Sequence, residues 1–109
     1  MFDWKSLLSL SQYEELMQAS DKKPFAVFKH STRCSVSHMA KKKMEMEWNL
    51  DDASLTLYFL DLLEHRDISN KIASDTHITH QSPQLIVIKN REAIYHESHG
   101  NIEVSDIKI

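Results

Sequence analysis

The chain has 109 residues, 41% of them hydrophobic and 27% charged, which indicates one globular domain over residues 1–109 and excludes disordered and fibrous classes. Its formal net charge of −3 removes the electrostatic basis for binding nucleic acid or an acidic membrane surface. The single glycine, Gly100, leaves no glycine-rich loop for a dinucleotide or P-loop phosphate site.

The cysteine content and the hydropathy pattern predict the compartment. Cys34 is the only cysteine, so an internal disulfide is excluded, which suits a reducing environment. The first residues lack a basic segment followed by a sustained apolar run, and no later run approaches the ~20 apolar residues of a spanning helix. We therefore expect a cytoplasmic protein.

The predicted elements alternate between strands and helices from the start of the chain. Residues 4–10 can supply a short strand, and Ser11 with Glu14 forms a capping-box pattern that predicts the start of a helix. That helix ends before Pro24. The apolar run over residues 25–29 then predicts a buried strand.

Residues 35–48 contain no glycine or proline, and their apolar side chains recur at three- and four-residue spacing. This spacing predicts a helix with one buried face. The residues assigned to that face are Val36, Met39, Ala40, Met44 and Trp48.

The second half of the chain predicts a further strand over residues 55–60 and a shorter helix over residues 66–75. Residues 85–88 form a continuous apolar run typical of a strand covered on both faces, and residues 93–98 alternate like a strand nearer the edge. Residues 100–109 leave room for a short C-terminal helix. Early alternation and a late hairpin predict an α/β domain with a mixed sheet and helices on both faces.

Cys34 lies at the junction between the strand over residues 25–29 and the helix over residues 35–48. Free backbone N–H groups at a helix start favour the thiolate, which is the nucleophilic form. A lone cysteine is more often a small buried hydrophobe, but the neighbours here are polar. Ser37 follows three residues later, so the pattern is Cys-x-x-Cys with serine in the second place. Cys34 is therefore our candidate nucleophile.

This order of elements, with a cysteine after the second strand and a proline before the fourth, resembles the thioredoxin fold over nearly the whole chain. The most specific matches are residues 34–37 at the redox motif, Ser82-Pro83 at the position of the family's cis-proline, and Lys89-Asn90 at the late hairpin. Within that superfamily, residues 28–34, the CxxS motif and residues 82–84 are similar to the monothiol bacilliredoxins. Those are small cytosolic proteins of redox homeostasis that act on mixed disulfides with the low-molecular-weight thiol bacillithiol.

Cys34 is the expected catalytic residue, and with no second cysteine it must pass any mixed disulfide to an external thiol. Ser37 either donates a hydrogen bond to the thiolate or caps the helix start, and both readings stay open. Arg33 would favour the thiolate and receive the malate carboxylates of bacillithiol, or is simply solvated. Ser35 stands where the family commonly has proline, and the C-terminal helix is shorter than the family's, so the chain departs from the pattern there.

The resemblance also implies where an incoming disulfide docks. Thr32, Ser82 and Pro83 would contact it, with the Ser82–Pro83 bond cis and packed beside Cys34. Bacillithiol is the implied co-substrate, and no permanently bound cofactor is expected. The implied partners are bacillithiolated proteins, the small thiol and a disulfide reductase, with neither nucleic acid nor a membrane.

Seven histidines raise the question of a metal site. The closest pairs are His77 with His80, His96 with His99, and the two histidines that flank Cys34, His30 and His38. The first pair falls in a loop and the second alternates along a strand, so the spacing predicts no metal site.

A second class of function stays open beside the oxidoreductase. A thioredoxin-like module that binds a partner without turnover would also tolerate serine at position 37. A reactive Cys34 would distinguish the two, since a binding module has no need of one.

Overall fold

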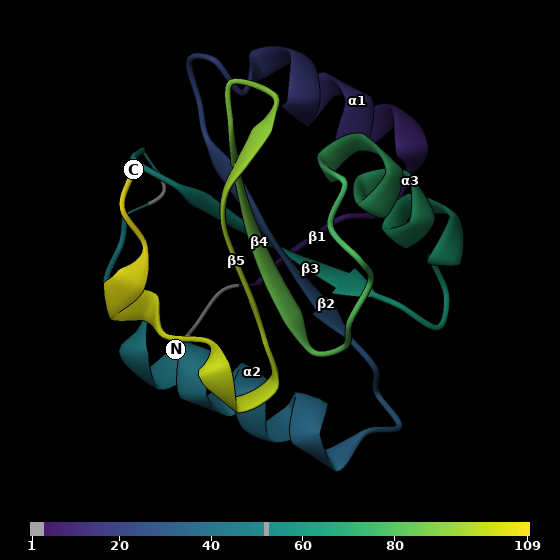
Figure 1. Ribbon diagram of the computed structural model, residues 1–109, viewed down its shortest axis with the longest axis vertical. Coiled ribbons are helices and arrows are strands. Elements are labelled where there is room, and N and C mark those ends of the chain that lie inside the picture. Colours follow the sequence, from purple (N-terminus) through teal and green to yellow (C-terminus); the bar gives the residue numbers. More distant parts are fainter. Residues whose placement is uncertain (1–3, 52) are drawn as a thin grey trace.

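A five-stranded mixed sheet forms the centre of the computed structural model, which describes residues 4–51 and 53–109 (Figure 1). The strand order is β1-β3-β2-β4-β5. The strands are β1 (Lys5–Ser6), β2 (Phe25–His30), β3 (Thr56–Asp61), β4 (Gln84–Lys89) and β5 (Glu92–Ser98). The first three are parallel to one another, whereas β4 pairs antiparallel with β2 and forms a hairpin with β5. The predicted α/β class and mixed sheet are confirmed.

Helices cover both faces of this sheet (Figure 1). The helices are α1 (Leu10–Ala19), α2 (Ser35–Glu47) and α3 (Arg66–Thr76), followed by the 3₁₀ turns η1 (His99–Asn101) and η2 (Val104–Asp106). Alternation along β2 separates two cores, because Phe28 packs in the cluster with α2 and Val27 in the cluster with α1 and α3. The C-terminal segment lies on the same face as α2.

The start of α1 differs from the prediction. Its N-cap is Ser9, whose Oγ accepts the N–H of Gln12 at 3.1 Å, so the Ser11–Glu14 capping box is wrong. Gln12 in turn accepts the N–H of Leu8 at 2.7 Å and donates to the carbonyl of Ser6 at 3.0 Å. Ser9 and Ser11 both fit the sequence pattern of a helix N-cap. The hydrogen bonds of Gln12 to the chain after β1 fix the helix start at Ser9.

The buried face of α2 is also rotated from the one predicted. The buried residues of α2 are Ser37, Ala40 and Met44. Val36 is 45% exposed and Met39 is 73% exposed, so the assignment of Val36 and Met39 to the core is wrong. The reason lies in the C-terminal segment, which contacts α2 but leaves an open hollow beside Val36 and Met39. The assignment of Ala40 and Met44 is confirmed.

The predicted short C-terminal helix is replaced by the two 3₁₀ turns. Ile102, Val104 and Ile107 are buried at spacings of two and three residues, which a continuous α-helix would not bring to one face. The hydroxyl of Tyr95 accepts the N–H of Glu103 at 3.1 Å and lies 3.3 Å from its carbonyl, which anchors the segment to β5. Among residues 4–51 and 53–109, no helix combines the length and apolar character needed to cross a membrane.

Candidate active site

Cys34 is the N-cap of α2, with an extended backbone at φ −110° and ψ 121°. Its carbonyl accepts the N–H of His38 at 3.2 Å, which is the first hydrogen bond of the helix, and its own N–H donates to Ser31 at 3.2 Å. The side chain is half-buried and makes no capping hydrogen bond to any described residue. The sulfur therefore lies at the positive end of the α2 dipole and does not cap the helix.

Ser37 lies fully buried one turn into α2. Its Oγ accepts the N–H of Ser31 at 3.3 Å and lies 3.5 Å from the Oγ of Ser82. One hydroxyl therefore connects the loop after β2, the first turn of α2 and the loop before β4. These contacts hold the two loops together through Ser37. Neither of the two roles predicted for Ser37 from the sequence, a hydrogen bond to the thiolate or a helix cap, included this one.

The Ser82–Pro83 peptide bond is cis, as the resemblance implies. Pro83 is buried, and its carbonyl accepts the N–H of His99 at 3.0 Å. Through Ser82 the loop reaches Ser37, one turn along α2 from Cys34. The structure therefore brings the predicted docking loop to the same end of the sheet as the nucleophile.

The other predicted residues lie on the surface around Cys34. Thr32, Arg33 and Ser35 are all exposed. The carbonyl of Thr32 accepts a hydrogen bond from Nε2 of His38 at 3.0 Å, which ties the loop before Cys34 back onto α2. Sequence reasoning gave His38 no role in this loop, although a position four residues after Cys34 would have put it on the same helix face.

His30, the last residue of β2, is a second residue of the candidate site whose role the sequence did not predict. Its ring is 1% exposed and lies edge-on to the ring of His38, with 4.8 Å between centroids. Burial lowers the pKa of His30, and the neighbouring His38 and Lys41 lower it further. Its Nδ1 has no hydrogen-bond partner among the described residues, so the buried ring is neutral at pH 7.

A buried lysine contacts the loop before β4 from the other face of the sheet. Lys29 is fully buried in β2, and its Nζ donates to the carbonyl of Ser69 at 3.2 Å and to Nδ1 of His80 at 3.4 Å. Burial lowers the pKa of Lys29 to about 8. The pKa of His80 is lowered by burial first and then by the charges of Lys29 and Arg66. A lysine within an apolar strand was the sequence signal for this contact.

No group of three or more metal-ligating side chains occurs among the described residues. Of the histidines considered from the sequence, His30 and His38 contact each other through their rings, and His80 bonds to Lys29. His77 ends α3 in the left-handed conformation, with φ 59°. These histidines serve packing and loop structure.

A family model described as monothiol bacilliredoxin BrxC matches residues 5–107, which is nearly the whole chain. The chain belongs to the monothiol bacilliredoxin family. Family membership indicates a redox role, and the half-buried Cys34 is the only cysteine in the sequence.

Solved structures show the fold of this bacilliredoxin-family chain. One described as having a thioredoxin fold is 32% identical with a TM-score of 0.77, covering 93% of this chain and 87% of its own. A thioredoxin of Malassezia sympodialis is 15% identical with a TM-score of 0.74, over 96% and 84% of the two chains. Mitochondrial thioredoxin 3 of Saccharomyces cerevisiae is 17% identical with a TM-score of 0.65, over 90% and 85%. The predicted thioredoxin-like fold is confirmed, and a redox enzyme is the class that family and fold indicate.

Proposed function

We propose that this protein is a monothiol thiol-disulfide oxidoreductase that removes bacillithiol from protein mixed disulfides through Cys34. The observation that carries the proposal is the position of the only cysteine. It is half-buried at the N-cap of α2, and the Ser37–Ser82 contact links that helix to the cis-proline loop. Membership of the monothiol bacilliredoxin family supports the same chemistry.

The first step is an exchange of disulfide partners. The Cys34 thiolate attacks the bacillithiol sulfur of a mixed disulfide, and a new S–S bond forms as the old one breaks. The substrate cysteine leaves with the electron pair of the broken bond and takes up a proton. The repaired protein departs as a thiol, and bacillithiol remains on Cys34.

The second step must use an external thiol, since no other cysteine exists in the chain. A second bacillithiol, as its thiolate, attacks the bacillithiol sulfur of the adduct and releases Cys34 as a thiolate. The product is the symmetrical bacillithiol disulfide, so bacillithiol is a co-substrate. A disulfide reductase that reduces this product is the further partner that the cycle needs.

The residues around Cys34 take supporting roles. Arg33 is exposed beside the nucleophile and receives a carboxylate of bacillithiol. Ser35 keeps a backbone N–H at the first helical position, which a proline would lack, so the helix start next to Cys34 has one more free donor. Ser37 positions the loops through its bonds to Ser31 and Ser82.

The docking of the substrate disulfide falls to the two loops that meet near Cys34. Thr32, Ser82 and Pro83 supply the contacts in this proposal, with Thr32 held in place by His38. The substrates are bacillithiolated proteins, and the reaction takes place in the reducing cytoplasm.

Mass spectrometry of a single turnover tests the proposal. Reduced protein is mixed with a bacillithiolated protein in the absence of free thiol, and we expect released substrate together with one bacillithiol on Cys34. Cys34→Ser should give neither product, whereas Ser11→Ala, an exposed serine within α1, should behave as the wild type. If the wild type releases no substrate and carries no adduct, the chain is a binding module without turnover.

A further inference from the structure

An apolar groove opens between α2 and the segment that follows β5. Its volume is about 320 Å³, and the atoms that line it are almost all apolar. One wall is formed by Val36, Met39 and Ala40 of α2, and the other by His99, Gly100 and Ile102. The volume suits one or two large side chains.

The groove continues outward along α2 into a second hollow of about 330 Å³, to which Met39 and Met46 both contribute. Met39 is 73% and Met46 is 80% exposed, although both are large apolar side chains. The two 3₁₀ turns leave this side of the helix uncovered. Neighbouring exposed apolar side chains of this kind mark a surface that another molecule covers.

Both walls of the groove begin at the active site. Val36 is two residues from Cys34 in the first turn of α2. On the opposite wall, the N–H of His99 donates to the carbonyl of Pro83 at 3.0 Å. A molecule held between Cys34 and the cis-proline loop is therefore already at the mouth of the groove.

We propose that this groove receives the protein half of the mixed disulfide, through a large aliphatic or aromatic side chain close to the modified cysteine of the substrate. The inference rests on the proposed function and specifies which proteins the site accepts. Bacillithiol, with its polar groups and carboxylates, has no complement in an apolar lining, whereas a polypeptide does. The unbranched methionine side chains can adapt to substrates of different shape.

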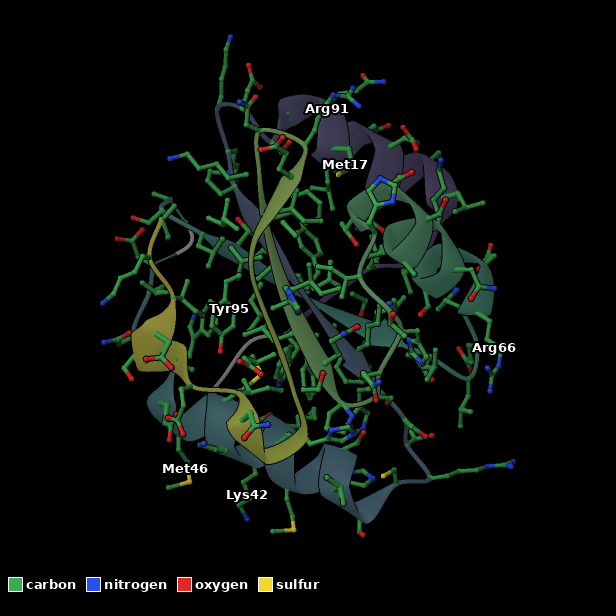
Figure 2. All side chains as sticks on the ribbon, in the orientation of Figure 1. Met17, Lys42, Met46, Arg66, Arg91 and Tyr95 are labelled. Carbon is green, nitrogen blue, oxygen red and sulfur yellow. The ribbon has the colours of Figure 1, made fainter. Side chains whose placement is uncertain are left out.

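The rim carries charges of both signs. The Nζ of Lys41 binds Glu45 at 2.9 Å and that of Lys43 binds Glu103 at 2.7 Å, so their charges are compensated. Lys42 and Met46 extend from α2 away from the sheet (Figure 2). Glu47 lines the same hollow as Lys42, so the inference rests on the apolar lining and not on charge.

Two bacillithiolated peptides test the inference. Each has one cysteine, with leucine three residues away on both sides in the first peptide and serine in the second. Below saturation, we expect the wild type to take bacillithiol from the leucine peptide about tenfold faster. Met39→Ser should lose this preference. Leu8→Ser should keep it, because Leu8 is 63% exposed and lies just before α1, which packs in a different core cluster from α2.

Reaction with the symmetrical bacillithiol disulfide is the internal control, since this disulfide has no peptide to enter the groove. Both variants should form the Cys34 adduct from it at the wild-type rate. Equal rates for the two peptides in the wild type would overturn the inference, as would a leucine preference that survives Met39→Ser. A wild-type dimer that Met39→Ser converts to a monomer would assign the groove to a second copy and also overturn it.

Failure of the proposed function gives a different result. In that case no disulfide, large or small, leaves an adduct on Cys34. The groove is then tested alone, by binding of the two reduced peptides to the Cys34→Ser protein. Tighter binding of the leucine peptide supports the groove, and equal binding overturns it.

Discussion

The ring of His38 lies edge-on to the buried ring of His30, with 4.8 Å between their centroids, and donates from Nε2 to the carbonyl of Thr32. His38 thereby joins the end of β2 to the loop that carries Cys34. The loop geometry thus depends on a side chain from the helix that follows it. A mobile loop would present the sulfur in many directions, so we expect this contact to position Cys34 for the proposed reaction.

Removal of the His38 contact should slow the reaction of Cys34. His38→Ala leaves the Thr32 carbonyl without its donor, and we expect the rate of adduct formation to fall about three- to tenfold. His38→Gln retains an N–H donor and should recover most of the rate. Stopped-flow measurement of the three proteins checks this. Equal rates for the alanine and glutamine variants would show that the hydrogen bond has no role.

The buried Lys29 should make stability depend on pH on the alkaline side. Burial lowers its pKa in the folded state to about 8, from an ordinary lysine pKa of 10.5. Between these values the unfolded chain binds more protons, so the free energy of unfolding rises with pH. We expect a gain of about 2 kcal/mol from pH 7 to pH 9.5, which Lys29→Met should abolish. Urea titrations at both pH values measure this gain. If Lys29→Met gains as much free energy of unfolding between the two pH values as the wild type, the assignment to Lys29 is wrong.

Acid should destabilise the protein through its buried histidines. Burial lowers the pKa of both His30 and His80 in the folded state. As pH falls through the ordinary histidine range near 6.5, the unfolded chain takes up protons first, so the free energy of unfolding decreases. Protonation of His80 would also remove the acceptor of the Lys29 hydrogen bond. Thermal unfolding between pH 7.5 and pH 5 should show a shallower pH dependence in His80→Gln than in the wild type. As a control, His96→Gln changes an exposed histidine and should leave that dependence unaltered.

A second thiol at position 37 should change the lifetime of the intermediate. Ser37 lies one turn from Cys34, and a cysteine there could attack the adduct without an external thiol. We expect Ser37→Cys to shorten the lifetime of the bacillithiol adduct about tenfold or more in the absence of free thiol. Ser37→Ala removes the same hydroxyl without adding a thiol and should leave the lifetime long. Mass spectra taken over time distinguish the variants, and a long-lived adduct in both would show that position 37 cannot reach the disulfide.

The sequence by itself predicted the order of the five strands and the three α-helices, and it indicated Cys34 as the candidate nucleophile. The apolar run of β2 and the helical spacing after Cys34 are local patterns, and each reports which faces are buried within one element. The resemblance carried by residues 34–37 and by Ser82-Pro83 then identified the superfamily and the cis bond. These features need only neighbours along the chain, so they were predictable.

The tertiary structure alone decided which surfaces meet. Val36 and Met39 have the spacing of core residues, yet they are exposed because the C-terminal segment leaves an open hollow beside them on α2. The contacts of Ser37 with Ser82 and of Lys29 with His80 join positions 45 and 51 residues apart. Hydrophobic periodicity predicts whether a side chain is buried or exposed. It does not predict which segment that side chain contacts, because this depends on the packing of segments far apart in the sequence. The groove beside Cys34 and the contact of Lys29 with the loop before β4 exist for that reason only in the folded chain.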